Sequence, residues 1–246
     1  YSDGGNVTLP ASNVMVQAIQ VICRQNKVLP NVFLLGAQKA GTTFMAQEVL
    51  MPSGVQTAVL YTKHPWHKGR TGHGTKEWHF FDMGVQRHYQ FFHALPACSE
   101  DVSPLKTHPN LRMADFTPLN LCLTNPGYWD DGTTPLRVKW ISSRVADSIC
   151  KLPGVLSQLY GDQAGKIRFL VQLREPLARM QSHWYRGHPK VLESSQFSTK
   201  VERVLHKWSH RKAVHEDLWR GLYGRQLEAW FRNFHPSQLP SFRTGT

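Results

Sequence analysis

The sequence has no run of about 18 apolar residues, so no segment of it predicts a transmembrane helix. The first residues also lack a lysine-led signal peptide with an apolar centre. The chain begins with Tyr1 rather than Met and stops at Thr246 without a closing element. We therefore expect a processed or carboxy-terminally truncated protein, in which any membrane anchor would lie upstream of these residues.

Acidic residues are scarce. The chain has 17 Asp and Glu against 29 Lys and Arg, which gives a formal net charge of +12. This balance predicts an anionic partner, such as a nucleic acid, a membrane face, a nucleotide or an acidic polymer. A basic surface without a specific ligand is the alternative. A hydrophobic fraction of 41% with only 19% charged residues indicates a globular chain rather than a disordered one.

The sequence has four cysteines, at positions 23, 98, 122 and 150, and no C-x-x-C pair. This spacing argues against a zinc ribbon and against a thioredoxin-type site. One or two disulfides in a luminal protein and buried free thiols are both compatible with it. Asn6-Val7-Thr8 is a glycosylation sequon, which matters only in a secretory compartment.

Alternating strands and helices are predicted along the chain. Apolar runs at 31–36 and 166–173 predict buried strands, and helices are expected at 43–50 and at 176–187, where Pro176 takes the favoured first position. This order predicts an α/β fold of the P-loop, three-layer type, with a mostly parallel central sheet flanked by helices. We expect a lead-in at 1–30 and a single domain at 31–246.

Other segments give weaker patterns. We expect a short helix at 14–24, a strand at 113–116 and a helix at 141–150. The segment 198–234 is predicted to be largely helical, because its leucines and aromatic residues recur on one helical face.

The segment Gly36-Ala37-Gln38-Lys39-Ala40-Gly41-Thr42-Thr43 has the glycine spacing of a phosphate-binding loop and follows an apolar run. A strand, a glycine-rich turn and a helix direct backbone N–H groups towards an anion. The lysine that nucleotide triphosphatases carry after the second glycine is displaced here to Lys39, and Arg174, not a carboxylate, follows the strand at 166–173. The pattern therefore favours an anion held by side chains over metal-bound ATP.

A second anion-binding pattern follows the strand at 166–173. Arg174 is placed at the carboxyl end of that strand, where open α/β sheets bind ligands. Ser182 comes eight residues later, about two helical turns along. A guanidinium and a hydroxyl in these positions suit a single phosphate. Arg179 is expected at the helix surface or in a salt bridge.

Both segments resemble sulfotransferases that use 3′-phosphoadenylyl sulfate (PAPS). GAQKAGTT is similar to their 5′-phosphosulfate loop, and LREPLARMQS to their 3′-phosphate motif. The resemblance implies that Lys39 stabilises charge on the bridging oxygen, and that Arg174 and Ser182 bind the 3′ phosphate. The implied donor-binding residues are Lys39, Ala40, Gly41, Thr42, Thr43, Arg174 and Ser182.

Lys76-Glu77-Trp78-His79-Phe80-Phe81-Asp82 resembles the K-E-x-H-F-F-D segment of glycosaminoglycan sulfotransferases, closest to the heparan sulfate glucosaminyl 3-O-sulfotransferase branch. The resemblance implies that Glu77 is the general base, with His79 and Asp82 tuning or orienting the site and Lys76 touching the donor or the acceptor. His79 as the base is the alternative. The basic stretch 64–76, with Lys68 and Arg70, is either an acceptor groove or a solvated loop.

A further match and two departures complete the resemblance. GLYGRQLEAW is similar to the family's G-x-Y-x-x-x-L-x-x-W helix, from which Gly221 and Tyr223 would reach the cleft. The family's E-K-[ST]-P segment corresponds to 115–118, with Phe116 at the position of the lysine, which puts heparan sulfate as the acceptor in doubt. The family's later glycine-rich 3′-phosphate loop has no counterpart before the chain stops.

The function implied is transfer of a sulfuryl group from PAPS to a hydroxyl or amine, releasing adenosine 3′,5′-bisphosphate without a metal. The acceptor expected is an anionic or neutral glycan, and no nucleic-acid partner is expected. Location in the Golgi lumen is implied, with the cytoplasm as the alternative. The rival functions are a P-loop kinase or triphosphatase and a non-catalytic, basic glycan-binding module.

Overall fold

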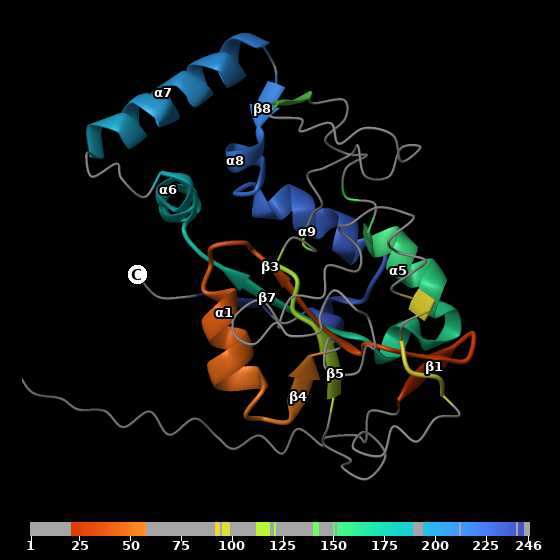
Figure 1. Ribbon diagram of the computed structural model, residues 1–246. Helices are drawn as coiled ribbons and strands as arrows, with labels where there is room; N and C mark the ends of the chain where they lie inside the picture. The colour runs from red at the N-terminus through yellow and green to blue at the C-terminus, as the bar shows by residue number, and fades with distance from the viewer. Residues whose placement is uncertain are drawn as a thin grey trace, which may run out of the picture.

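The computed structural model describes residues 21–57, 92–93, 95–98, 112–118, 121, 140–142, 150, 152–188, 194–211, 213–239 and 241–243. Within these residues the centre of the molecule is a parallel sheet with the strand order β4-β5-β3-β7-β9 (Figure 1). Its strands are β3 (Val32–Gly36), β4 (Val55–Thr57), β5 (Arg112–Asp115), β7 (Arg168–Leu173) and β9 (Ser241–Arg243). The predicted α/β fold with a parallel sheet is confirmed.

The side chains of β3 alternate between the two faces of the sheet, as the period of a strand requires. Phe33 and Leu35 belong to the larger hydrophobic core, whereas Val32 and Leu34 belong to a second core on the other face. All four are buried. A strand apolar at every position is typical of a parallel sheet covered on both sides.

Helices cover both faces, which gives three layers. The larger core is completed by α5 (Leu152–Tyr160) and α9 (Tyr223–Phe231), which contribute Tyr160 and Trp230. The second core is closed by the helical run made of α1 (Thr42–Phe44) and η1 (Met45–Leu50), through Ala46. η6 (Gly161–Lys166) leads from α5 into β7, and η7 (Pro236–Gln238) precedes β9.

A group of elements beyond the carboxyl end of β7 stands beside the sheet. It comprises α6 (Pro176–Gly187), α7 (Ser194–Arg211), α8 (Glu216–Trp219) and the antiparallel pair of β6 (Trp140–Ser142) and β8 (Ala213–His215). Figure 1 shows α7 at the outer side of this group, with α6 and β8 next to it. None of the described helices is both long and apolar enough to cross a bilayer.

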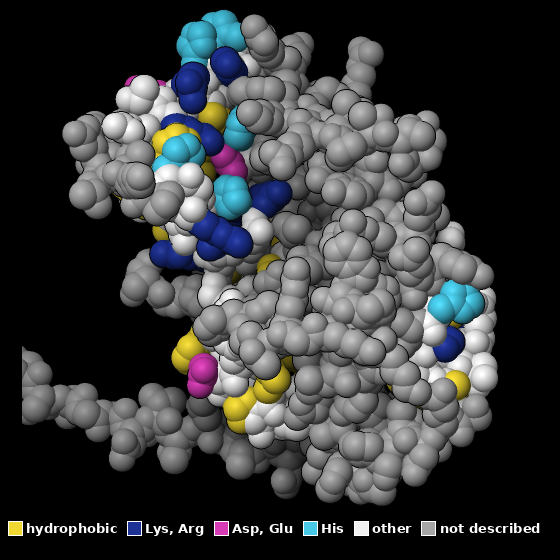
Figure 2. Space-filling model, viewed as in Figure 1, with side chains coloured by type: hydrophobic (Ala, Val, Ile, Leu, Met, Phe, Trp, Pro, Cys, Tyr) yellow, Lys and Arg dark blue, Asp and Glu magenta, His cyan; other side chains and the backbone are white. Residues whose placement is uncertain are grey.

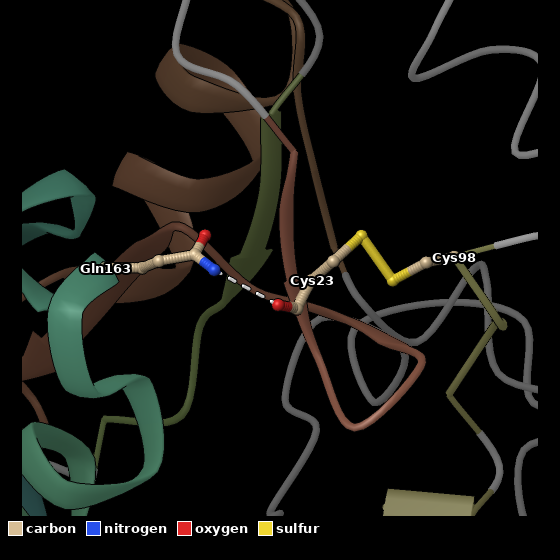
Figure 3. The surroundings of a disulfide bond; sticks show 3 residues. All are labelled: Cys23, Cys98 and Gln163. Atoms are coloured by element: carbon tan, nitrogen blue, oxygen red, sulfur yellow. Dashed lines mark hydrogen bonds between the residues drawn. A yellow bond between two sulfur atoms is a disulfide. The ribbon is translucent and has the colours of Figure 1, made fainter.

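The amino-terminal part of the described chain is a hairpin, formed by β1 (Ile22–Arg24) and β2 (Lys27–Leu29). A disulfide joins Cys23 to Cys98, whose Cα atoms lie 6.0 Å apart, and Gln163 donates a hydrogen bond to the carbonyl of Cys23 at 3.2 Å (Figure 3). Cys150 is also disulfide-bonded. Of the two possibilities for the cysteines, disulfides are therefore present.

Two predicted helices differ from the structure. The helix expected at 14–24 is wrong for residues 22–24, which form β1 and pair with β2; residues 14–20 lie outside the described part. The helix expected at 141–150 is wrong for Ile141 and Ser142, which pair with β8, while residues 143–149 are not described. Both stretches contain β-branched or aromatic residues that suit a strand once a partner strand is at hand.

Candidate functional site

The glycine-rich loop connects β3 to α1. The backbone conformation at its first glycine, Gly36, shows why glycine is needed there. Gly36 has φ 133°, and a Cβ placed on it would lie 2.4 Å from the carbonyl oxygen of Pro118. Lys39 also takes a positive φ, of 69°. Because a side chain at position 36 would meet backbone, this position requires glycine.

The second glycine is tied to the neighbouring strand β7. Gly41 has φ 90°, and a Cβ on it would lie 3.1 Å from Nε2 of Gln172. The N–H of Ala37 donates to the carbonyl of Gln172 at 2.6 Å, so the loop is fastened to β7 at its start as well. The Gln172 side chain is almost fully buried. The backbone of Gln172 thus fastens the start of the loop, and its side chain lies close to Gly41.

The helical run after the loop begins at Thr42 with Gly41 as its N-cap, and no side chain caps it. The first N–H groups of a helix lack partners inside the helix and carry partial positive charge. Thr42 is buried and Thr43 half-buried, both in the first turn. The arrangement suits an anion bound at the loop.

Arg174 brings the second predicted anion motif to the same loop. Its Nη1 donates a hydrogen bond to the carbonyl oxygen of Lys39 at 3.3 Å, although the two residues are 135 apart in the sequence. The hydroxyl of Tyr223 donates to the carbonyl of Arg174 at 2.8 Å. Arg220 donates to Oε1 of Gln38 within the loop. Three distant segments therefore converge at the carboxyl edge of β3 and β7.

Helix α6 carries the rest of this motif. Its N-cap, Glu175, accepts hydrogen bonds from the N–H groups of Leu177 and Ala178 at 2.8 and 2.6 Å, and Pro176 takes the first position. Ser182 is half-buried two turns into the helix. The expectation of a surface position for Arg179 is wrong, because this side chain is completely buried and donates to the backbone carbonyl of Asp217.

Asp217, on α8, is a buried acidic residue that contacts basic side chains from α6 and α7. Asp217 is only 5% exposed, and its carboxylate lies 3.0 Å from Nζ of Lys200 and 3.6 Å from Nε2 of His183. Burial alone would raise the pKa of Asp217, but the hydrogen bond and the charge of Lys200 outweigh it and lower the pKa below its usual value. The carboxylate is therefore ionised at neutral pH.

His183 interacts electrostatically both with Asp217 and with Lys39 of the loop. Burial lowers the pKa of its imidazole to about 4, against the opposing effect of Asp217. The positive charges of Arg220, Arg179 and Lys39 contribute to this lowering of the pKa. The imidazole is therefore neutral at pH 7, and it lies within the field of the cations that surround the loop.

The segment that departs from the E-K-[ST]-P pattern is part of the core. Asp115 is completely buried and accepts hydrogen bonds from the N–H and the hydroxyl of Thr117, at 3.0 and 2.6 Å. Phe116 is also completely buried, in the core beneath β3. Phe116, at the position where the sulfotransferase motif has a lysine, thus packs inside the protein. The carbonyl oxygen of Pro118 lies against Gly36.

Some predicted residues come together and others lie outside the described part. Lys39, Ala40, Gly41, Thr42, Thr43 and Arg174 gather at one edge of the sheet, and Ser182 lies on α6, which begins three residues after β7 ends. Glu77, His79, Asp82, Lys76, Lys68 and Arg70 all lie outside the described residues. The sequence did not single out Gln172, Arg220 or Asp217, because no short motif contains them.

The comparisons with known proteins found no matching family model and no matching curated protein. Among solved structures, 15 chains match. One is the crystal structure of a sulfotransferase from Alicyclobacillus acidocaldarius, with 16% sequence identity and a TM-score of 0.45. The match covers 88% of this chain and 73% of that chain.

Proposed function

We propose that the chain is a sulfotransferase that transfers a sulfuryl group from PAPS to a hydroxyl or amine, most simply on a glycan. The observation that carries this proposal is the contact between Arg174 and Lys39. Two anion-binding patterns were predicted from separate parts of the sequence, and Lys39 of one and Arg174 of the other meet at one edge of the sheet. One small donor with two anionic ends would reach both.

The residues present fit such a donor. Gly36 and Gly41 take positive φ angles and pack closely against Pro118 and Gln172, which shapes the turn before the helix, and that helix has no side-chain cap. Residues 36–43 would hold the 5′ phosphosulfate, with hydroxyl groups from Thr42 and Thr43. Arg174 and Ser182 would hold the 3′ phosphate. The bound donor supplies an activated sulfuryl group with a phosphate as its leaving group.

Charge and proton transfer are assigned to different side chains. The ammonium of Lys39 places positive charge beside the loop, where it would stabilise negative charge on the leaving phosphate oxygen. Glu77 is proposed to accept the proton of the acceptor hydroxyl as the new S–O bond forms, with His79 and Asp82 orienting it. Arg174 and Ser182, by fixing the far end of the donor, would align it with the acceptor.

The acceptor and the compartment are proposed on separate grounds. The net charge of +12 and the cations Lys68, Arg70 and Lys76 favour an acceptor that is an acidic glycan. The disulfide between Cys23 and Cys98 favours an oxidising compartment such as the Golgi lumen over the cytoplasm. An anchor outside this chain would hold the protein at the membrane.

The donor site is tested without the acceptor, by calorimetric titration with adenosine 3′,5′-bisphosphate. Lys39→Ala is expected to weaken binding at least tenfold, because it removes a charged contact. Lys166→Ala is the matched control, since Lys166 is exposed at the end of η6, before the opposite end of β7. Equal affinities for the wild type and Lys39→Ala would contradict the assignment of the loop.

The chemistry is tested with a labelled-donor transfer assay on a mixture of glycans. Glu77→Gln is expected to abolish transfer and to keep nucleotide binding, because it removes only the proton acceptor. Unimpaired transfer would exclude Glu77 as the base. Magnesium-dependent turnover of ATP, with no binding of adenosine 3′,5′-bisphosphate, would identify a P-loop kinase or triphosphatase instead.

A further inference from the structure

A pocket of about 360 Å³ lies between α6, α7 and the β8–α8 segment. Its lining includes Lys200, Arg203 and Lys207 from α7, His183 and Trp184 from α6, and Asp217 from α8. Figure 2 shows dark-blue and cyan side chains gathered at this end of the molecule, with an acidic side chain between them. This volume is at the lower end of the range for small-molecule sites, which suits one sugar residue with a charged substituent.

The lining is strongly basic. The residues Lys200, Arg203 and Lys207 have the spacing i, i+3 and i+7, so they share one face of α7. Asp217 is the single carboxylate that the described lining contains, and it lies 3.0 Å from Lys200. The cations of the lining outnumber the carboxylate three to one, which favours an anionic ligand.

The aromatic side chain of the pocket disfavours a nucleobase. The indole of Trp184 is stacked with His188, with 3.7 Å between the ring centroids, and Nζ of Lys200 lies 4.7 Å from the indole centroid. A stacking platform for bases needs an uncovered ring face. Imidazoles of His183, His188 and His215 instead offer hydrogen-bonding groups that suit hydroxyls.

The pocket is distinct from the donor loop but close to it. None of the residues assigned to donor binding is part of its lining. His183, which is part of the lining, directly follows Ser182, and Lys39 contributes to the depressed pKa of this imidazole. A ligand in the pocket would therefore lie close to the proposed donor site.

We propose that this pocket binds a sulfate ester carried by a sugar residue, as a second anion site for a glycan that is already sulfated. That this site helps to bind the acceptor rests on the proposed function, whereas binding of a sulfated sugar in the pocket does not depend on it. Charge-assisted hydrogen bonds from Arg203 and Lys207 would hold the ester oxygens.

The test uses a sulfated disaccharide released from chondroitin sulfate, its unsulfated counterpart and inorganic sulfate, each titrated into the full chain by calorimetry. The sulfated disaccharide is expected to bind at least tenfold more tightly than either of the others. Arg203→Gln/Lys207→Gln is expected to weaken it at least tenfold, and Arg203→Lys/Lys207→Arg to restore most of the affinity. Lys166→Gln/Arg232→Gln removes two exposed cations elsewhere and is expected to change the affinity less than twofold.

Equal losses in the two glutamine double variants would overturn the proposal, because they would indicate general surface charge. Inorganic sulfate binding as tightly as the disaccharide would overturn the sugar part of it. Parallel titration with adenosine 3′,5′-bisphosphate separates the two proposals. If the nucleotide binds but Arg203→Gln/Lys207→Gln does not change the affinity for the disaccharide, the pocket proposal alone is contradicted. If the nucleotide does not bind but the double variant weakens disaccharide binding, the donor-site proposal is contradicted and the pocket proposal stands.

Discussion

The guanidinium of Arg174 donates a hydrogen bond to the backbone carbonyl of Lys39 at 3.3 Å. Arg174 stands after β7 and Lys39 after β3, and these strands are parallel neighbours in the sheet. Because the carboxyl ends of parallel strands meet at one edge, the topology itself brings the two residues together. Arg174 thus braces the loop that contains Lys39, and in the proposed function it would also contact the donor.

Arg174→Gln is expected to weaken the binding of adenosine 3′,5′-bisphosphate at least tenfold, because it removes a charged donor. Stability should change by less than about 1 kcal/mol, since Arg174 is exposed. Arg168→Gln is the control at the other end of the same strand and should leave the affinity within twofold. Calorimetry measures the affinity and thermal unfolding the stability; similar affinities for the two variants would contradict the role of Arg174.

Gly36→Ala is expected to destabilise the protein by about 2–4 kcal/mol, because the new Cβ would meet the carbonyl oxygen of Pro118 in a backbone conformation with φ 133°. Gly165→Ala is the matched control: no atom lies within 4 Å of its Cβ, so the change should be within about 1 kcal/mol of zero. Urea unfolding compares the two. A loss below 1 kcal/mol for Gly36→Ala would contradict the close approach.

The sequence predicted the elements whose signals are local. Pro176 at the first helical position, behind an apolar strand, predicts both β7 and α6, and Glu175 as N-cap agrees with that boundary. Ile141 and Ser142 were predicted as helix, because the alternation of a short strand is weak without its partner. Their partner β8 lies about 70 residues further on, and no local pattern indicates such a pairing.

The proposed donor site was predictable in part and the basic pocket was not. The loop at 36–43 and Arg174 belong to linear motifs, each readable within a dozen residues. Lys200, Arg203 and Lys207 show a helical spacing, but their meeting with His183 and Asp217 depends on how α6, α7 and α8 pack. The spacing of those cations was the one signal for the pocket that the sequence contained.

Lys200→Met is expected to destabilise the protein by about 2–4 kcal/mol, because it leaves the carboxylate of Asp217 buried without its 3.0 Å ammonium partner. The double variant Lys200→Met/Asp217→Asn should be less destabilised than Lys200→Met alone, since no buried charge remains. Urea unfolding of the four proteins of this cycle measures the coupling. Additive losses would show that the pair does not act as a unit.

Acid is expected to weaken the fold through His183. Its folded-state pKa is about 4, below the value of about 6.5 in an unfolded chain, so the unfolded chain binds a proton that the folded protein does not. The free energy of unfolding should therefore fall as the pH drops from 6.5 towards 4, by no more than about 1 kcal/mol per pH unit for this partly exposed ring. Urea unfolding across this range should show a shallower slope for His183→Gln; identical slopes would contradict the shift.

Cys23→Ser/Cys98→Ser is expected to destabilise the protein by about 4 kcal/mol, because the disulfide closes a separation of 75 residues and restricts the unfolded chain. The effect should also appear as lower protection of the β1–β2 hairpin in hydrogen exchange. Unfolding by urea under non-reducing conditions measures the loss. A loss below 1 kcal/mol would contradict the expected restriction of the unfolded chain by this bond.

The bond between Cys23 and Cys98 also determines how the protein responds to cleavage of its polypeptide. A protease that cuts once between these two residues leaves two fragments that stay covalently attached, so the hairpin cannot diffuse away from the body of the protein. Such a nicked molecule would migrate as one band in electrophoresis without a reductant and as two bands after reduction. The same linkage keeps β1 and β2 on the core while the intervening chain is cut.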